Sequence, residues 1–268
     1  MIKITDFKRI VFYGCSFTVG SELSDLELFP NLTQAQIDKI KIKEGYSFYN
    51  AVDPVSRDTL DNQKSWTRWF SDELGLPWEN RASGGSSMGQ IIFNIESDLI
   101  TGRILDNDLV IVGITSPDRL CRFTKLGPNS LILNNLDVRW EDESFRNKFI
   151  TYIASDGYIL YNWYKDINYI DLLSNKLQGR LLQQFVWANM EEIFQFNTNS
   201  KPHYMISEYM TKIVNRNVKF DSIIDKDLSF TTLNGWAPEN KHAFNHPKLK
   251  LHQAFGKQIA KTFKEKYS

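Results

Sequence analysis

The stretch RIVFYGCSFT at residues 9–18 places a short apolar strand directly before a glycine and a serine. Residues 10–13 are all apolar or aromatic, which is typical of a strand buried inside a sheet. Ser16 follows Gly14, where this run ends, by two positions. A serine hydroxyl is a weak nucleophile until a tight turn presents it and a base takes its proton. The stretch therefore predicts either a nucleophile at Ser16 or a polar turn after an ordinary strand.

Further along the chain, apolar strands alternate with amphipathic helices. In the run DLVIVG at residues 108–113, the residues after Asp108 are continuously apolar, as expected for a parallel strand covered on both faces. A shorter strand is expected at residues 76–79. Apolar residues recur at helical spacing in three segments: residues 65–75, 88–100 and 249–265. This alternation predicts a three-layer α/β fold, in which helices flank a parallel sheet.

Two long segments do not fit the alternation, and we expect both to be insertions into one domain that spans residues 1–268. Residues 21–64 are polar and irregular, with one helix expected near residues 33–42. The second insertion covers about residues 120–200. Within and after it, a helix and then a strand are expected at residues 177–196 and 203–207.

Composition excludes several classes of function. The 268 residues carry 32 Lys and Arg against 32 Asp and Glu, so no global charge draws the chain to nucleic acid or anionic lipid. No apolar stretch approaches the ~20 residues that span a bilayer, and the first ten residues do not resemble a signal peptide. We therefore expect a soluble, cytoplasmic chain that binds neither nucleic acid nor membrane. Its two cysteines show no metal-binding spacing, and free thiols are the simpler interpretation.

Four polar segments follow predicted strands or precede the last helix: residues 14–16, 84–86, 113–115 and 245–247. The loops at the carboxyl ends of parallel strands converge on one crevice. Residues far apart in the sequence can therefore meet there. Acyl transfer needs such a meeting of a nucleophile, a base and hydrogen-bond donors for an oxyanion.

The order and spacing of these segments resemble the SGNH/GDSL hydrolases, a family of esterases and lipases. The four segments that carry the resemblance are Gly14 to Thr18, Asn80 to Ser87, Asp108 to Thr115, and His246-Pro247 with the helix after it. The resemblance implies a flavodoxin-like sheet and a serine hydrolase that cleaves a carboxylic ester without a cofactor or metal. The expected substrate is a small-molecule or glycan ester, and the aromatic-rich insertions, which could line a glycan cleft, favour an O-acetyl group on a carbohydrate.

The resemblance also implies the role of each site residue. Ser16 would be the nucleophile and His246 its base. The oxyanion would be held by the backbone N–H groups of Ser16 and Gly85 and by Thr115. Cys15 stands where the family has an aspartate in its first block, and Thr115 stands where it has an asparagine.

The family's third catalytic residue is an aspartate three positions before the histidine, and this chain has Ala243 there. The site is then a Ser–His dyad, or Glu239 or another acid orients the imidazole. His242 is a rival to His246 or a further contact. Arg119, just after the third segment, forms a structural ion pair or binds an anionic group of the substrate.

Other interpretations of the same residues stay open. His252 lies on the last helix, where packing is its expected role. His242 and His246 have a spacing that could ligate a metal, although Pro247 argues against a helix there. The loop of Gly84 could cradle a phosphate at a helix start. Finally, the departures from the family pattern are compatible with a binding or structural protein that has lost the chemistry.

Overall fold

The computed structural model describes residues 3–44, 48, 52–117, 119–124, 127–132, 156–189, 192, 221–235, 237–242 and 246–267. At its centre is a parallel sheet of strand order β2-β1-β3-β6. The strands are β1 (Arg9–Tyr13), β2 (Trp78–Asn80), β3 (Asp108–Ile114) and β6 (Leu181–Phe185). This order is that of flavodoxin-like sheets. The predicted fold class is confirmed.

Strand β3 lies in the middle of the sheet, and all seven of its residues are buried. It pairs with β1 on one side, where Val11 aligns with Val110, and with β6 on the other, where Ile111 aligns with Leu182. Strands covered on both faces need apolar side chains in both directions. The continuous apolar runs in the sequence meet that need.

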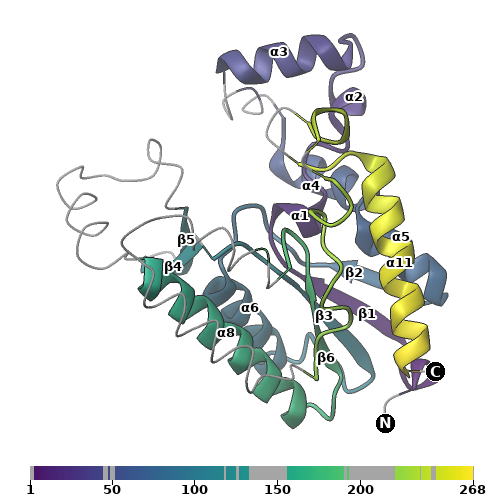
Figure 1. Cartoon of the computed structure of the whole chain (residues 1–268), viewed down its shortest axis with the longest axis vertical. Coiled ribbons are helices and arrows are strands. Elements are labelled where there is room, and N and C mark those ends of the chain that lie inside the picture. The colour runs from purple at the N-terminus through teal and green to yellow at the C-terminus, as the bar shows by residue number, and fades with distance from the viewer. Residues whose placement is uncertain are drawn as a thin grey trace.

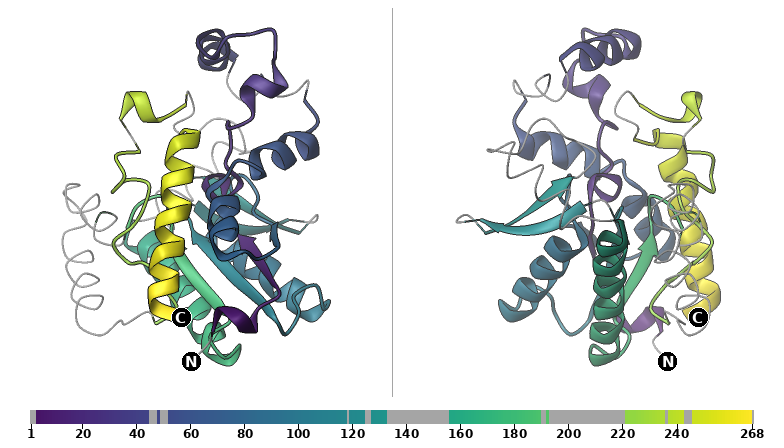
Figure 2. Two further views of the ribbon diagram at one scale, coloured as in Figure 1. Left: turned by 90° about the vertical axis from the view of Figure 1, so that its right-hand side faces the viewer. Right: turned by 60° about the vertical axis from the view of Figure 1, so that its left-hand side comes forward.

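Helices form a layer on each face of the sheet (Figures 1 and 2). One layer contains α5 (Trp66–Leu74) and α11 (Leu249–Tyr267), which pack against each other and against Phe12. The opposite layer contains α6 (Met88–Ile100) and α8 (Asp156–Lys176), which pack against Val11. The hydrophobic core is therefore divided in two by the sheet.

Local signals set the ends of these helices. The Ser65 hydroxyl accepts a hydrogen bond from the backbone N–H of Thr67 and caps α5, and Gly75 ends that helix in the left-handed conformation. Ser87 caps α6 in the same way, by accepting from the N–H of Gln90. Each cap satisfies a backbone group that the helix leaves without a partner.

The described residues of the segment 21–64 include three short helices beyond the carboxyl end of β1 (upper part of Figure 1). They are α2 (Asp25–Leu28), α3 (Gln34–Glu44) and α4 (Pro54–Asn62). Helix α3 is the helix expected near residues 33–42. Helix α4 contacts α1 (Ser16–Val19), the single turn that follows β1. This placement brings the segment next to Ser16.

The prediction for residues 120–200 is wrong in its second half. Helix α8 covers one face of the sheet and β6 is its fourth described strand, so residues 156–185 belong to the core of the fold. The helix expected at residues 177–196 is wrong for the same reason, because β6 occupies residues 181–185. Its sequence LLQQF places Gln183 and Gln184 in a buried strand. These polar residues interrupt the apolar pattern by which a buried strand is predicted.

The remaining elements are smaller. A hairpin of β4 (Arg119–Thr124) and β5 (Gly127–Ile132) follows β3, and 3-10 turns lie at Ile4–Asp6 and Pro238–Asn240. The strand expected at residues 203–207 lies outside the described residues. Of the helices that the structure describes, none combines the length and apolar character needed to cross a bilayer.

Candidate active site

Ser16 begins α1, on a tight turn at the carboxyl end of β1. The backbone N–H groups of Thr18 and Val19 both donate to the carbonyl of Cys15, at 2.8 and 3.0 Å. Ser16 itself is 7% exposed, at the edge of the sheet where the loops converge. The structure thus places Ser16 on the kind of turn that the sequence predicted.

Two glycines allow this turn to pack against the sheet. A Cβ atom at Gly14 would lie 2.1 Å from Thr18 Oγ1, and one at Gly113 would lie 2.2 Å from the same atom. Thr18 is fully buried between the ends of β1 and β3. The close approach of its side chain explains why glycine stands just after β1 and just before the last residue of β3.

The loop after β2 is anchored to the same turn. Asn80 Nδ2 donates to the carbonyl of Thr18 at 2.8 Å, and the N–H of Ser83 donates to the carbonyl of Gly14 at 3.1 Å. Gly85 then takes a left-handed conformation, with φ of 81°. The N–H groups of Gly85 and Ser16 donate no hydrogen bond to any described residue. Both remain available as donors to an oxyanion.

His246 reaches this turn from the other end of the chain. Its ring lies against the ring of Phe17, the neighbour of Ser16, with the two centroids 5.3 Å apart. Its Nδ1 lies 2.8 Å from Glu22 Oε2, and its side chain is 9% exposed. The structure therefore brings His246 to the helical turn of Ser16, and an acid comes with it.

Glu22 is held tightly in this position. It is 4% exposed, and its backbone has a φ of 74°, a value that residues other than glycine rarely adopt. Such strain persists only where surrounding contacts fix it, and it is frequent in active sites. Its second oxygen, Oε1, accepts a hydrogen bond from Lys41 Nζ at 2.6 Å.

The charge state of Glu22 sets the tautomer of His246. Burial alone raises the pKa of Glu22, but hydrogen bonds and charge from His246 and Lys41 outweigh it and lower the pKa to about 2. At neutral pH the carboxylate is ionised and can only accept hydrogen bonds. Nδ1 of His246 must then carry a proton and donate it. In a neutral ring this leaves Nε2 with the free lone pair that a general base needs.

Among the described residues, Ser16 Oγ and His246 form no hydrogen bond in this conformation. Hydrogen bonds of a catalytic serine are often long before substrate binds. The missing hydrogen bond therefore does not exclude Ser16 and His246 as a nucleophile and its base. The contact between His246 and its carboxylate partner, Glu22, is by contrast already formed in this conformation.

The acid that contacts the ring of His246 is Glu22 and not Glu239, the acid that the sequence suggested. Glu239 lies exposed on a 3-10 turn, where its carbonyl accepts from Lys248 Nζ at 2.9 Å. Glu22 is only six positions from Ser16, but nothing in the local pattern distinguishes it from other acids of that polar segment. Ala243, the position of the expected aspartate, lies outside the described residues.

His242 lies beside the site without contacting a described polar group through its ring. Its backbone N–H donates to the carbonyl of His246 at 2.8 Å. Both ring nitrogens are enclosed and have no partner among the described residues. Burial lowers the pKa of the ring, so His242 is neutral at pH 7.

Thr115 and Arg119 both lie close to the loop of Gly85. The N–H of Thr115 faces Met88 Sδ at 3.5 Å, and Arg119 Nη1 donates to the carbonyl of Ser86 at 3.5 Å. The hydroxyl of Thr115 is fully enclosed and has no partner among the described residues. A substrate oxygen could reach it only after its surroundings move.

His252 and Cys15 have structural positions. His252 is fully buried, accepts a hydrogen bond from the N–H of Trp66 at 3.1 Å, and has a pKa lowered to about 3 by burial. As a neutral ring it therefore satisfies the first N–H group of α5, beside the cap that Ser65 provides. Cys15 is a free thiol at 0% exposure within the core that includes Phe12.

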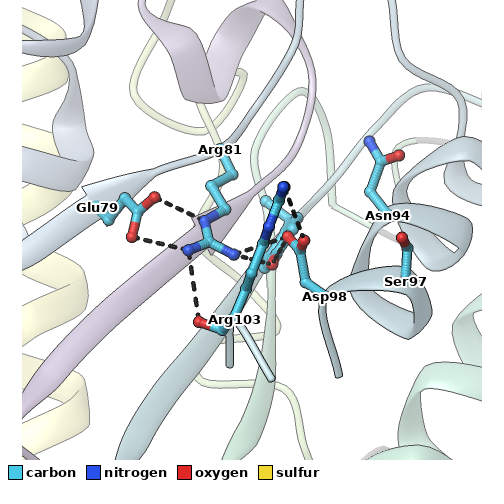
Figure 3. Close-up of a pocket in the computed structure, with 7 residues that line it drawn as sticks. Glu79, Arg81, Asn94, Ser97, Asp98 and Arg103 are labelled. Carbon is cyan, nitrogen blue, oxygen red and sulfur yellow. Dashed lines mark hydrogen bonds and ion pairs between the residues drawn. The ribbon is translucent and has the colours of Figure 1, made fainter. Parts of the chain in front are cut away.

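A separate cavity of about 620 Å³ lies between β2 and α6 (Figure 3). Its charged groups pair with one another: Arg81 bonds Glu79 through two nitrogens and Asp98 through a third contact at 2.8 Å. Neither Ser16 nor His246 lines it. The cavity therefore does not belong to the candidate active site. In the described part of the chain, no group of three or more His, Cys, Asp or Glu is placed to hold a metal ion.

No protein-family model and no curated protein matches the chain. Among solved structures it is similar to a member of the lipolytic protein G-D-S-L family from Veillonella parvula, at 12% identity and a TM-score of 0.44, covering 94% of this chain and 95% of that one. It is also similar to an acetyl xylan esterase from Geobacillus stearothermophilus, at 14% identity and a TM-score of 0.41, covering 96% and 94%. A lipase from a goat rumen metagenome matches at 11% identity and a TM-score of 0.43, covering 95% and 96%. Such low similarity does not assign a function, which must come from the residues of the site.

Proposed function

We propose that the chain is a serine hydrolase that cleaves a carboxylic ester through an acyl-enzyme on Ser16. The observation that carries this proposal is the buried Glu22–His246 pair, packed through Phe17 on the turn that begins with Ser16. A neutral imidazole with Nδ1 fixed by a carboxylate is prepared to accept a proton at Nε2. The hydroxyl of Ser16, on that same turn, is the nucleophile from which this proton would come.

In the proposed reaction, Ser16 Oγ attacks the ester carbonyl while its proton passes to His246 Nε2. The N–H groups of Ser16 and Gly85 stabilise the oxyanion, and ionised Glu22 stabilises the imidazolium. When the tetrahedral intermediate collapses, the C–O bond to the alcohol breaks and His246 returns the proton to that alcohol. Water then attacks the acyl-enzyme, with His246 as base, and releases the carboxylic acid and free Ser16.

Arg119 is proposed to contact the substrate beside the Gly85 loop, because its guanidinium already bonds the carbonyl of Ser86. Thr115 is proposed as a third oxyanion donor that becomes accessible when substrate enters. A small ester or an acetylated carbohydrate is the substrate class to test first, because the chain is rich in aromatic residues, 13% of the total, that could line a glycan cleft.

A second candidate is a binding or structural protein that keeps this fold without the chemistry. It is favoured by two observations: within the described residues Ser16 does not bond His246, and the hydroxyl of Thr115 is enclosed. The two candidates differ in whether Ser16 reacts with an electrophile.

The test compares the wild type with Ser16→Ala in hydrolysis of p-nitrophenyl acetate and in labelling by a fluorophosphonate probe. We expect stoichiometric labelling at Ser16, and a loss of at least ~10³-fold in kcat for the variant. Ser97→Ala, which lines the cavity of Figure 3, is the matched control and should keep the wild-type rate. Equal rates for wild type and Ser16→Ala, with no label on Ser16, would establish the second candidate instead.

A further inference from the structure

We propose that Lys41, on the inserted helix α3, is a positioning residue of the catalytic centre that acts through Glu22 on His246. This inference rests on the proposed function, since it assigns Lys41 a part in proton transfer by that same histidine. It makes the segment of residues 21–64 a component of the active site rather than a peripheral addition to the fold.

The geometry is a chain of buried contacts. Lys41 is 0% exposed, and its ammonium donates to Glu22 Oε1 at 2.6 Å and to a second carboxylate, that of Asp25 on α2. Glu22 Oε2 faces His246 Nδ1 at 2.8 Å. Each oxygen of Glu22 therefore has its own donor. A carboxylate held at both oxygens cannot rotate away from the imidazole.

The charges of this cluster have a net sign opposite to that of an imidazolium. With a neutral imidazole, Glu22, Asp25 and Lys41 together carry one net negative charge, and protonation of His246 neutralises it. Burying a lysine between two carboxylates costs desolvation energy, and this cost can exceed the gain from their attraction. Stability alone is therefore a poor explanation for the cluster. Holding the carboxylate of Glu22 against His246 would explain why the lysine is buried there.

Other ionisable groups face the cluster and are part of its electrostatics. They include His242 from the segment before α11, Asp38 from α3, and Asp61 and Arg57 from α4. His242 is neutral at pH 7, and burial raises the pKa of Asp61 to about 6. Lys41 is the described cation that contacts Glu22 directly, so its removal should have the largest effect on the Glu22–His246 pair.

The experiment measures kcat/KM for p-nitrophenyl acetate from pH 4 to 9 in the wild type and in Lys41→Met. Removing the ammonium removes a positive charge beside Glu22, and a more negative site should bind a proton more tightly. The acid limb of the profile should move up by about one pH unit, and kcat should fall about tenfold with little change in KM. Lys43→Met, an exposed lysine on the same helix, is the matched control and should leave the limb in place.

A second measurement does not depend on turnover. The ring resonance of His246, assigned with His246→Asn, is followed by NMR against pH, and its midpoint should move in the same direction in Lys41→Met. If Ser16→Ala hydrolyses the ester as well as the wild type, the proposed function fails, while this midpoint still decides whether Lys41 acts on His246.

Lys41→Gln keeps an amide donor for the two carboxylates and replaces Lys41→Met if that variant does not fold. A folded variant with an unmoved acid limb and an unmoved NMR midpoint overturns the proposal. Failure of both variants to fold also overturns it, because Lys41 is then required for stability and not for positioning.

Discussion

Replacing Glu22 by glutamine should disable the base while changing hardly any volume. The carboxylate of Glu22 accepts from Lys41 at one oxygen, 2.6 Å away, and from His246 at the other, 2.8 Å away. Glutamine offers only one acceptor oxygen, and its NH₂ group can only donate. One of the two donors must therefore lose its acceptor.

Lys41 should keep its hydrogen bond to the one acceptor oxygen of the glutamine. A hydrogen bond to a charged donor contributes about 1.5–3 kcal/mol, against about 0.5–1.5 kcal/mol for one between neutral groups. The NH₂ group of the introduced glutamine then faces Nδ1 of His246, which must accept and so give up its proton. The ring switches to the tautomer that carries its proton on Nε2, where the proton of Ser16 should arrive.

The wrong tautomer and the lost carboxylate charge together should reduce kcat by ~10³–10⁴-fold, which corresponds to about 4–5.5 kcal/mol of transition-state stabilisation. The assay is steady-state hydrolysis of p-nitrophenyl acetate at pH 7.5, with circular dichroism to confirm folding. KM should change little, because Glu22 is 4% exposed and its carboxylate faces the imidazole and Lys41 rather than open solvent.

Glu27→Gln is the matched control. Glu27 lies on α2, is about half exposed, and pairs with Lys64 at the surface, so its loss should leave kcat within about twofold. A folded Glu22→Gln enzyme with kcat close to that of the wild type would refute the reasoning, because Glu22 would then have no part in setting the state of His246.

Two further predictions concern stability. In Gly256→Ala, the new Cβ would lie 2.4 Å from the backbone oxygen of Trp66 and force α11 away from α5, so the variant should lose about 2–3 kcal/mol in urea unfolding, whereas Gly84→Ala, with no atom within 4 Å, should lose little. The pKa of Asp61 is raised by burial to about 6 from its ordinary value of 3.8, so the folded state binds its proton more tightly and stability is lost as the pH rises between these values. Asp61→Asn should therefore unfold at a higher temperature than the wild type at pH 7.5 and at a similar temperature at pH 4. The exposed Asp72→Asn should show no such pH dependence, and a constant difference for Asp61→Asn across this range would contradict the assignment.

The sequence by itself determined the layered α/β class and the place of Ser16. Apolar runs such as residues 109–113 indicate burial directly, because the side chains of a strand covered on both faces are mostly apolar. The turn at Gly14 is equally local, since the close approach of Thr18 leaves room only for glycine. The sequence did not predict β6, because its two buried glutamines interrupt the apolar run that identifies a central strand.

Only the tertiary structure decided which acid serves His246. Glu22 and His246 are separated by 224 positions, and Lys41 reaches Glu22 from a helix that the sequence marked merely as an insertion. Many acids in that segment have the same local pattern, and what distinguishes Glu22 is burial and a left-handed backbone that no periodicity encodes. The physical reason is that strands and helix caps depend on neighbours along the chain, whereas the state of a buried carboxylate depends on the charges that folding brings to each of its oxygens.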